Sequence, residues 1–594
     1  MNDLVFDRMQ ALRAEMHRLG LAGFVVPHED AYLNEYIGAT DARLEWLTGF
    51  SGSAGIAVVL ADHAAVLSDA RYTAQIRREC PGTLFEVHDL VDVAWRDYAV
   101  RNARGGIIGF DPQLHSVDAV TLLRAAAAAH GCRVVPVAAN LVDAIWTERP
   151  ARIPQPAMPH PIEVAGEAAS AKCRRIGAQI GAEAMLVATC DNTAWLLNIR
   201  GADVPNQPLP LARAVLFADG HVELFIDPAS VSRELVTHLG PTVAVHPPGA
   251  LGERLDALAG QSILVDPTVT PDWIETRLLE AGARVVHGAG PLALAQAVKN
   301  PVEISGFRAA HRRDGAAFTA LLYWIEQANQ AGTIEALDEL AVVARLEAIR
   351  QAQNTYRGQS FRTISATGAN AALPHYRPTE ATNTGILTDT VLLVDAGAHY
   401  NDGTTDMTRT VAIGQPQPEH VRSYTLVVKA HIAHARLRFP AGIGAMHIDA
   451  VARQHLWEAG WDYGHGTAHL VGSLLKVHEG PLYMHWRRGN TVPILPGMLL
   501  ADEPGHYREG RYGVRFENIL LVHEPTMPEG GDVAMASFEA ISLAPIDRRL
   551  LDPSLLGWQD IAWIDAYHAT VLHELSGLVA PEVASWLANE TRPL

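Results

Sequence analysis

The sequence predicts a chain of three domains, in which two related α/β domains precede a larger α+β domain. Its 594 residues exceed what one hydrophobic core usually supports, so several domains are expected. Prolines mark two boundaries along the chain, and the first two segments resemble each other. In the third segment, acidic side chains stand beside strand-like apolar sequence, where an isolated charge would be costly.

The first boundary is the segment 148–161, ERPARIPQPAMPHP. It predicts an extended linker, because each proline removes a backbone donor and restricts the residue before it. The second boundary lies near Pro301, which precedes a long stretch with apolar residues at every third or fourth position, as in a helix. We therefore expect domains over residues 1–150, 160–300 and 301–594. Beyond about Leu550 two further helices are expected, with no role in chemistry.

Each of the first two segments contains a Trp-Leu pair followed by a predicted β-hairpin. The pairs are Trp46-Leu47 and Trp195-Leu196, and the hairpins span residues 58–69 and 214–227. Both hairpins show an apolar strand, a turn around Ala-Asp and a second strand that ends in Asp. Two related α/β domains explain this similarity, and chance likeness of short hairpins is the alternative.

Composition and charge exclude several classes of partner. The formal net charge of −19 and the pI near 5.8 argue against nucleic acid and against an anionic membrane surface. No apolar run approaches the roughly 20 residues that cross a bilayer, and the N-terminal segment is typical of a folded helix rather than a signal peptide. The four cysteines form no CxxC pair, so neither disulfides nor a thiolate metal site is expected. These features predict a cytoplasmic protein.

Four carboxylates and one histidine in the C-terminal half form the most informative set of residues. An ionised carboxylate next to apolar strands is costly to desolvate unless it has a strong partner. Two divalent cations would balance four negative charges, and a neutral imidazole would complete the shell without changing that balance. The set consists of Asp395, Asp406, His469, Glu503 and Glu517.

Taken one at a time, these residues also have ordinary structural explanations. Asp395 and Asp406 flank a predicted turn at 401–403, and an Asp near a strand end is commonly a solvated turn former. Glu517 is predicted to lie in mid-strand with Arg515 two residues earlier on the same face, so a buried ion pair between them is an alternative. That ion pair would leave the other carboxylates unexplained.

His469 lies in the glycine-rich stretch GHGTAHLVGSLLKVHEGP together with His465 and His478. A single histidine in such a place is more often a core residue than a ligand. The pair His478-Glu479 does not begin the helical motif of single-zinc peptidases, because Leu482 stands where the second histidine should be and Gly480-Pro481 would break the helix. The set of ligands therefore predicts a two-metal hydrolase instead.

The motifs DAGAHYNDGTTDMTRT, VHEGP and DEPGHYREGRYGVRFEN are long and follow one another in this order. They resemble the Xaa-Pro aminopeptidases of the pita-bread metallopeptidase superfamily, and the likeness covers nearly the whole chain. The segments DARLEWLTGFSGSAG, DNTAWLLNIRGADVP and LANETRPL resemble the long, three-domain branch of that family. The resemblance implies two creatinase-like N-terminal domains followed by a pita-bread catalytic domain.

The resemblance also implies how the ligands divide between two metal ions. Asp406 and Glu517 would bridge both ions, and Asp395 would complete one of them. His469 and Glu503 would complete the other. The family usually uses Mn2+, although mixed carboxylate and imidazole ligation also suits Co, Fe or Zn.

The implied reaction is hydrolysis of the N-terminal Xaa-Pro bond of peptides by a hydroxide that bridges the two metals. Glu503 would take a proton and pass it to the departing proline nitrogen. His375 and His478 match two histidines that line the family's active site and help to stabilise the tetrahedral intermediate. Arg515 matches an arginine that lies behind the ligands. By resemblance alone, a homodimer is expected.

The chain departs from the family pattern at three positions. Ala468 and Leu470 stand where the family usually has glycines beside the ligand histidine, and His506 replaces a common aromatic residue. If either backbone needed a positive φ, a side chain there would cost about 1 kcal/mol or more. Leu470 could also narrow the pocket and alter substrate preference.

Two other functions stay open from the sequence. A prolidase-like Xaa-Pro dipeptidase would use the same site, although prolidases are usually shorter and must recognise a free carboxylate close behind proline. A non-catalytic binding module is the second, because this fold recurs in proteins that have lost the metals. The intact ligands, with His375 and His478, favour the metal-dependent aminopeptidase, and metal-free creatinase-like hydrolysis would leave the carboxylates without a use.

Overall fold

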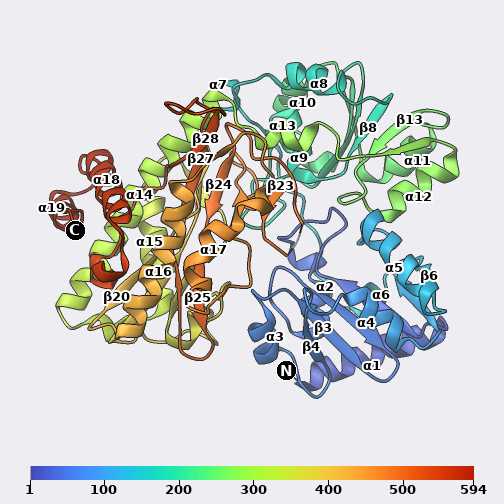
Figure 1. The fold of residues 1–594 in the computed structure, drawn as a ribbon. Helices are drawn as coiled ribbons and strands as arrows, with labels where there is room; N and C mark the ends of the chain where they lie inside the picture. The colour runs from blue at the N-terminus through green and yellow to red at the C-terminus, as the bar shows by residue number, and fades with distance from the viewer. Residues whose placement is uncertain (1, 488) are drawn as a thin grey trace. The chain divides into compact units, whose positions relative to one another are not determined.

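The computed structural model describes residues 2–487 and 489–594 (Figure 1). It divides into two compact units, with the division between Ala293 and Leu294. All the residues of the predicted metal site belong to the second unit. Within the described part of the chain, no helix combines the length and the apolar character needed to span a membrane.

The first unit contains two six-stranded sheets within residues 23–287, and both have the same topology. In each sheet the first strand pairs antiparallel with a hairpin on one side and parallel with a later strand on the other. The hairpins are those predicted at 58–69 and 214–227. The prediction of two related α/β domains is therefore confirmed. The strand orders are β4 (Glu86–Asp89), β3 (Ala64–Ser68), β2 (Ile56–Leu60), β1 (Gly23–Pro27), β5 (Ile107–Phe110), β6 (Arg133–Pro136), and β12 (Val243–His246), β11 (Val222–Ile226), β10 (Ala212–Phe217), β8 (Ala184–Val187), β13 (Ser262–Val265), β14 (Arg284–His287).

Helices accompany both sheets, and an extended linker joins the two halves of this unit. The N-terminal helix α1 (Asn2–Arg18) buries Met9, Leu12 and Met16, which follow its 3.6-residue period. Most of residues 148–161 is irregular, as predicted, apart from the short strand β7 (Met158–Pro159), which pairs with β9 (Ile199–Arg200). The other helices are α2 (Arg43–Thr48), α3 (Thr73–Glu79), α4 (Trp95–Asn102), α5 (Val117–Ala129), α6 (Leu141–Ile145), α7 (Ile162–Ala165), α8 (Ala169–Gly177), α9 (Cys190–Leu197), α10 (Arg233–Leu239), α11 (Leu251–Asp256), α12 (Asp272–Ala281) and α13 (Leu292–Ala297).

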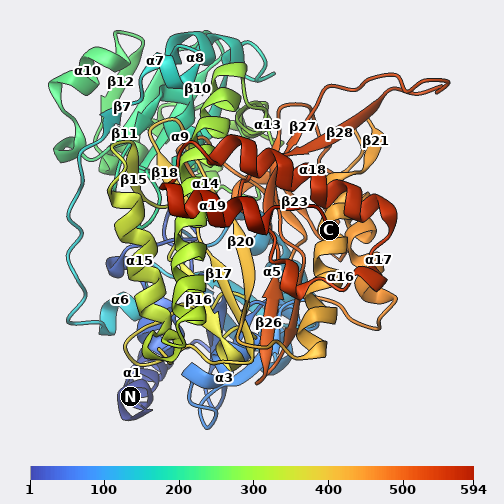
Figure 2. The same ribbon diagram turned by 90° about the vertical axis from the view of Figure 1, so that its left-hand side faces the viewer.

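The long helix α14 (Pro301–Gln330) runs through the second unit (Figure 2). Its start is well capped: the Asn300 side chain accepts the N–H groups of Val302 and Glu303, while the Glu303 carboxylate accepts the N–H of Asn300. Pro301 occupies the first helical position, where a missing N–H costs nothing. The two helices predicted beyond Leu550 are α18 (Trp558–Leu575) and α19 (Pro581–Glu590), and both pack on α14.

Several sheets of the second unit carry the site residues within their strands or beside the strand ends. A six-stranded sheet within residues 438–540 has the order β21, β28, β27, β24, β22, β23, and a smaller sheet has the order β16, β17, β20. The strands are β15 (Tyr356–Gln359), β16 (Ile364–Thr367), β17 (Thr390–Asp395), β18 (Ala398–Tyr400), β19 (Gly403–Thr404), β20 (Thr408–Ile413), β21 (Arg438–Pro440), β22 (Ala468–Leu470), β23 (Glu479–Met484), β24 (Leu499–Asp502), β25 (Gly505–Arg508), β26 (Tyr512–Arg515), β27 (Asn518–Val522) and β28 (Met535–Ala540). The remaining helices are α15 (Glu339–Gln351), α16 (Pro418–Ala435) and α17 (Asp449–Trp457).

Strand β22 explains why the chain tolerates side chains on both sides of His469. Ala468 and Leu470 have ordinary extended backbone without a positive φ, so the strain considered above does not arise. Successive side chains of a strand point to opposite faces, and both residues join a buried apolar cluster with Leu482 and Leu500. The family glycines are therefore replaced on the core face of the strand.

His506 fills an aromatic position by stacking. Its ring lies parallel to that of Trp461, with 4.1 Å between the centroids, and its Nδ1 is hydrogen-bonded to Ser423 on α16. Burial, together with Arg508, lowers the pKa of His506 to about 4. The imidazole is thus a neutral, buried aromatic residue in the folded chain.

Truncation of Leu470 tests its place in the core. Leu470→Ala is expected to lower the free energy of unfolding by about 2–5 kcal/mol, because it removes buried methyl groups and leaves a cavity. Urea denaturation of the full chain measures this loss. The control Leu470→Met conserves volume and should cost less than about 1.5 kcal/mol. Equal stability of the alanine variant and the wild type would show that Leu470 does not pack as described.

His506→Phe tests the buried imidazole through pH. In the unfolded chain His506 titrates near its ordinary pKa of about 6.5, above its pKa in the folded chain, so protons favour unfolding as the pH falls from about 7 toward 4. Between pH 7.5 and 5 this histidine should remove about 2 kcal/mol of stability, which the phenylalanine variant retains. Urea midpoints of both chains across this range measure the difference. Parallel pH profiles would contradict it.

Candidate metal centre

Four of the five predicted ligands lie at or beside the end of a strand in the second unit, and His469 lies within a short strand. Backbone pairing is interrupted at such ends, so a polar side chain can turn out of the sheet. Asp395 ends β17, Asp406 lies between β19 and β20, His469 is the middle residue of β22, Glu503 follows β24, and Glu517 lies between β26 and β27.

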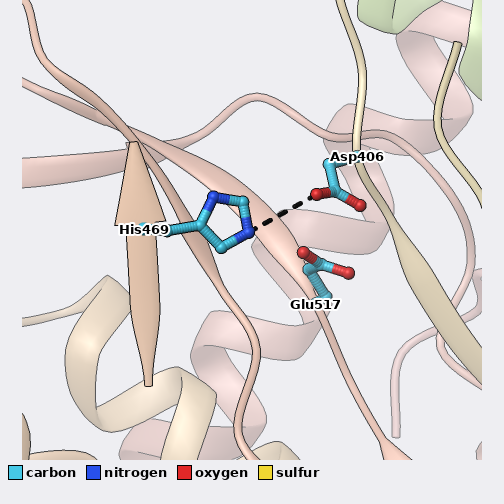
Figure 3. Close-up of side chains that lie close together, drawn as sticks. All are labelled: Asp406, His469 and Glu517. Carbon is cyan, nitrogen blue, oxygen red and sulfur yellow. Dashed lines mark ion pairs between the residues drawn. The ribbon is translucent and has the colours of Figure 1, made fainter. Parts of the chain in front are cut away.

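Three of these residues converge closely. One ligand-capable atom from each of Asp406, His469 and Glu517 lies within 4.8 Å of the others, and all three side chains are buried (Figure 3). His469 Nε2 is 3.6 Å from Asp406 Oδ2 and 3.9 Å from Glu503 Oε1. Its Nδ1 donates to the Leu470 carbonyl over 2.9 Å, which places the proton on Nδ1 and leaves the Nε2 lone pair facing the carboxylates.

Asp395 is joined to this group by its neighbours on the sheet. It pairs with Thr408 in the register of β17 and β20, and Thr408 Oγ1 donates to Glu517 Oε2 over 2.7 Å. Arg515 Nη2 donates to Asp395 Oδ2, whereas Asp395 Oδ1 is buried and has no hydrogen-bond partner among the described residues. A buried carboxylate oxygen without a donor is the place where a cation would be accommodated.

The electrostatics of the cluster also fit bound cations. Burial, followed by repulsion from Asp395 and Glu503, raises the pKa of Asp406 well above its ordinary value. Burial and the nearby Asp406, Asp395 and Glu503 likewise raise the pKa of Glu517. So many buried like charges oppose one another unless positive charge is placed among them. The donor set of carboxylates with one imidazole suits divalent metal ions.

His375 and His478 lie beside each other near this cluster. Their rings stack with 6.3 Å between centroids and an interplanar angle of 22°. The His478 ring also meets His469 edge to face, with 4.5 Å between the centroids. Both side chains are half-buried, so they border the cluster where solvent can still reach them.

The structure around Arg515 and Glu517 differs from the prediction in two respects: the strand assignment and the ion-pair partner of Arg515. The expected continuous strand through Glu517 is wrong: β26 ends at Arg515, and β27 begins at Asn518 in another sheet. The alternative of an Arg515–Glu517 ion pair is replaced by an ion pair between Arg515 and Asp395. Both differences have one cause, because the local sequence pattern of residues 512–522 does not reveal where the chain leaves one sheet for the next.

The expectation that Leu470 narrows the pocket is also wrong. Leu470 and Ala468 face the apolar cluster behind β22, while His469 faces the carboxylates. The period of two along a strand makes these directions opposite. The departure from the family pattern therefore changes the core rather than the lining of the site.

A hydrogen-bonded chain that was not predicted from the sequence lies behind Asp395. The Tyr507 hydroxyl accepts a hydrogen bond from Arg515 Nη1 over 2.7 Å and lies 2.9 Å from His465 Nε2. His465 Nδ1 faces the Gly466 carbonyl, so Nε2 is the acceptor of the Tyr507 proton. The only local signal was the position of His465 in the same glycine-rich segment as His469.

Four family profiles match successive parts of this chain. "Creatinase/Prolidase N-terminal domain" matches residues 8–145 and again residues 148–303. "Metallopeptidase family M24" matches residues 305–524, and the C-terminal region of peptidase M24 matches residues 534–594. The M24 match includes all five candidate ligands.

Whole proteins are similar along the full length. A probable Xaa-Pro aminopeptidase P from Colletotrichum graminicola is 37% identical, with 99% of each chain covered. One from Talaromyces stipitatus is 36% identical over 99% of this chain and 92% of that protein. The crystal structure of an X-prolyl aminopeptidase from Caenorhabditis elegans, described as a cytosolic enzyme with a di-nuclear active site, covers 99% of this chain and 100% of that chain at 32% identity and a TM-score of 0.93.

These likenesses confirm the predicted family and fold class, two creatinase-like N-terminal domains followed by a pita-bread domain. The similarity extends over the whole length rather than over the catalytic segment alone. The chain therefore belongs to the Xaa-Pro aminopeptidase P family, within metallopeptidase family M24.

Proposed function

We propose that this protein is a metal-dependent aminopeptidase that hydrolyses the bond between the first residue of a peptide and a proline in second position. The observation that carries the proposal is the buried convergence of Asp406, His469 and Glu517 beside Glu503. The full-length relatives named Xaa-Pro aminopeptidase P support the substrate class.

The proposed centre holds two divalent cations. Asp406 and Glu517 would lie between both ions, Asp395 would complete one ion, and His469 and Glu503 the other. The short separations around His469 Nε2 support this division, as does Asp395 Oδ1, which has no hydrogen-bond partner in the described part of the chain. When bound, a pair of such ions supplies a water of lowered pKa and an electrophile for the peptide carbonyl.

Glu503 would act as the base and acid of the reaction. It would accept a proton from the attacking water and return it to the proline nitrogen as the bond breaks. Its side chain lies beside His469 and keeps some exposure to solvent, so substrate can approach it. His478 is placed near the same histidine and would stabilise the negative charge that develops on the carbonyl oxygen.

The paired histidines would also help to explain why proline is accepted. A bond to proline is a tertiary amide without an N–H, so an enzyme that relies on that donor binds it poorly. His375 and His478 would instead border the leaving group through their stacked rings. Arg515 would hold Asp395 in place through its ion pair.

The proposal extends to the metal, the cellular location, the oligomeric state and the domain boundaries. We propose Mn2+ as the metal, because most of the donors are hard carboxylate oxygens. The cytosolic enzyme of Caenorhabditis elegans supports a cytoplasmic location, and a homodimer is proposed from the family likeness. We further propose domains over residues 1–150, 160–300 and 301–594.

Cleavage of matched peptides tests the function. Chelator-treated protein should release the first residue of an Xaa-Pro-Yaa tripeptide only after Mn2+ is added, and should cleave the Xaa-Pro dipeptide less well. Preference for the dipeptide would identify a prolidase-like enzyme. If the folded protein cleaves neither peptide with any divalent metal, the binding-module alternative replaces the enzyme.

Replacement of Glu503 tests its role in proton transfer. Glu503→Gln keeps the size of the side chain but removes the proton acceptor, and kcat should fall by about 10²–10⁴-fold. Steady-state kinetics at saturating Mn2+, with metal content measured on the same samples, separate this effect from loss of metal. The control Glu509→Gln changes an exposed residue in the nearby β25–β26 turn. Unchanged kcat in the Glu503 variant would remove Glu503 from the mechanism.

A further inference from the structure

We propose that His431 is a positioning residue for the metal centre, because it bridges Asp502 and Asn518, the immediate neighbours of Glu503 and Glu517. This inference rests on the proposed function, since it assigns His431 to the same centre. His431 lies on α16 and is completely buried. We call Asp502, His431 and Asn518 the His431 bridge.

The bridge spans two strands at the point where the ligands leave them. β24 and β27 are antiparallel, and Asp502 is paired with Asn518 in their register. Glu503 follows one member of this pair and Glu517 precedes the other, so both carboxylates extend beyond the same end of the strand pair. A change in the spacing of this pair would therefore alter the separation of the two carboxylates.

The hydrogen bonds of the bridge have one consistent direction. Arg409 Nη2 donates to Asn518 Oδ1 over 2.8 Å, which fixes the orientation of the amide. Asn518 Nδ2 then donates to His431 Nε2 over 3.0 Å, and His431 Nδ1 donates to Asp502 Oδ2 over 2.7 Å. This arrangement selects a single neutral tautomer of His431. Each of the four side chains has at most 1% of its surface exposed, so water does not substitute for a lost partner.

The same network reaches the backbone of a ligand. Arg409 Nη1 donates to the carbonyls of Glu517 and Thr408, over 2.7 and 2.8 Å. The guanidinium also lies over the ring of Phe516, at 4.3 Å from the centroid, and the His431 ring is 4.9 Å from that ring. Phe516 and Asn518, the residues before and after Glu517, are thus both in contact with Arg409 and His431.

His434 offers a matched control on the same helix. It is also buried, and its Nδ1 lies 2.7 Å from the other oxygen of Asp502. Its Nε2 faces the Ile448 carbonyl rather than Asn518. Replacement of His434 therefore removes a partner of Asp502 without breaking the connection between the two strands.

Binding of Mn2+ to chelator-stripped, full-length protein tests the inference. His431→Leu should weaken Mn2+ affinity about 10–100-fold by calorimetry, the range seen when residues behind metal ligands are lost. It should also change the electron paramagnetic resonance spectrum of the bound Mn2+ ions, which depends on their separation. His431→Gln can accept from Asn518 and donate to Asp502, so it should restore much of the affinity.

The comparison with His434→Leu decides whether His431 has only a structural role. We expect both leucine variants to lose stability to urea, but only the His431 variant to lose Mn2+ affinity and alter the spectrum. Unchanged affinity in a folded His431→Leu, or equal losses in both variants, would overturn the proposal.

Two further outcomes are distinguishable. If His431→Leu does not fold, His431→Asn is polar but too short to span both partners and should show the same loss of affinity. Failure of both to fold would overturn the proposal, by assigning His431 to the fold rather than to the centre. Failure of the proposed function appears instead in the wild-type protein, as an absence of Mn2+ binding and of Xaa-Pro cleavage.

Discussion

Repulsion among buried carboxylates is the constraint on which the second unit depends. Asp406 and Glu517 are buried side by side, and the carboxylate of Glu503 lies close to both. Burial and the repulsion between these carboxylates raise the pKa values of Asp406 and Glu517. Hydrophobic packing alone would not hold such a group together, because each charge loses its water. Bound cations relieve that cost, so metal binding and the stability of this part of the fold are thermodynamically linked.

Buried hydrogen bonds next to the candidate ligands hold these carboxylates in place. Each acidic candidate ligand lies next to a residue, or to a backbone carbonyl, that is hydrogen-bonded within a buried polar network. Arg350 donates to the carbonyls of Ala396 and Gly397, which follow the candidate ligand Asp395. Its ion-pair partner Asp314 accepts the hydroxyl of Thr405, which precedes Asp406. The His431 bridge supports Glu503 and Glu517 in the same way. Buried charged and amide groups therefore support the candidate centre from the side that faces the protein core.

Much of this organisation could be predicted locally. The hairpins at 58–69 and 214–227, the long helix from Pro301 and the C-terminal helices follow from hydrophobic period, turn residues and capping, which act over a few residues. The candidate ligands could also be predicted from local sequence. An acidic residue beside an apolar strand needs a partner wherever that strand lies in the fold. Their convergence around His469 agrees with that argument, while their metal-binding roles stay predictions.

By itself, the sequence determined which residue types were available to the site and which segments form helices and strands. Only the tertiary structure decided which of these side chains contact one another. It placed Asp395, not Glu517, against Arg515, ended one strand and began another within the segment 512–522, and turned Leu470 away from the site. It also brought Tyr507 and His465 behind Asp395. The reason is physical: a strand's two faces are alike in local energy, and only pairing with distant strands selects which face is covered and which side chains are brought together.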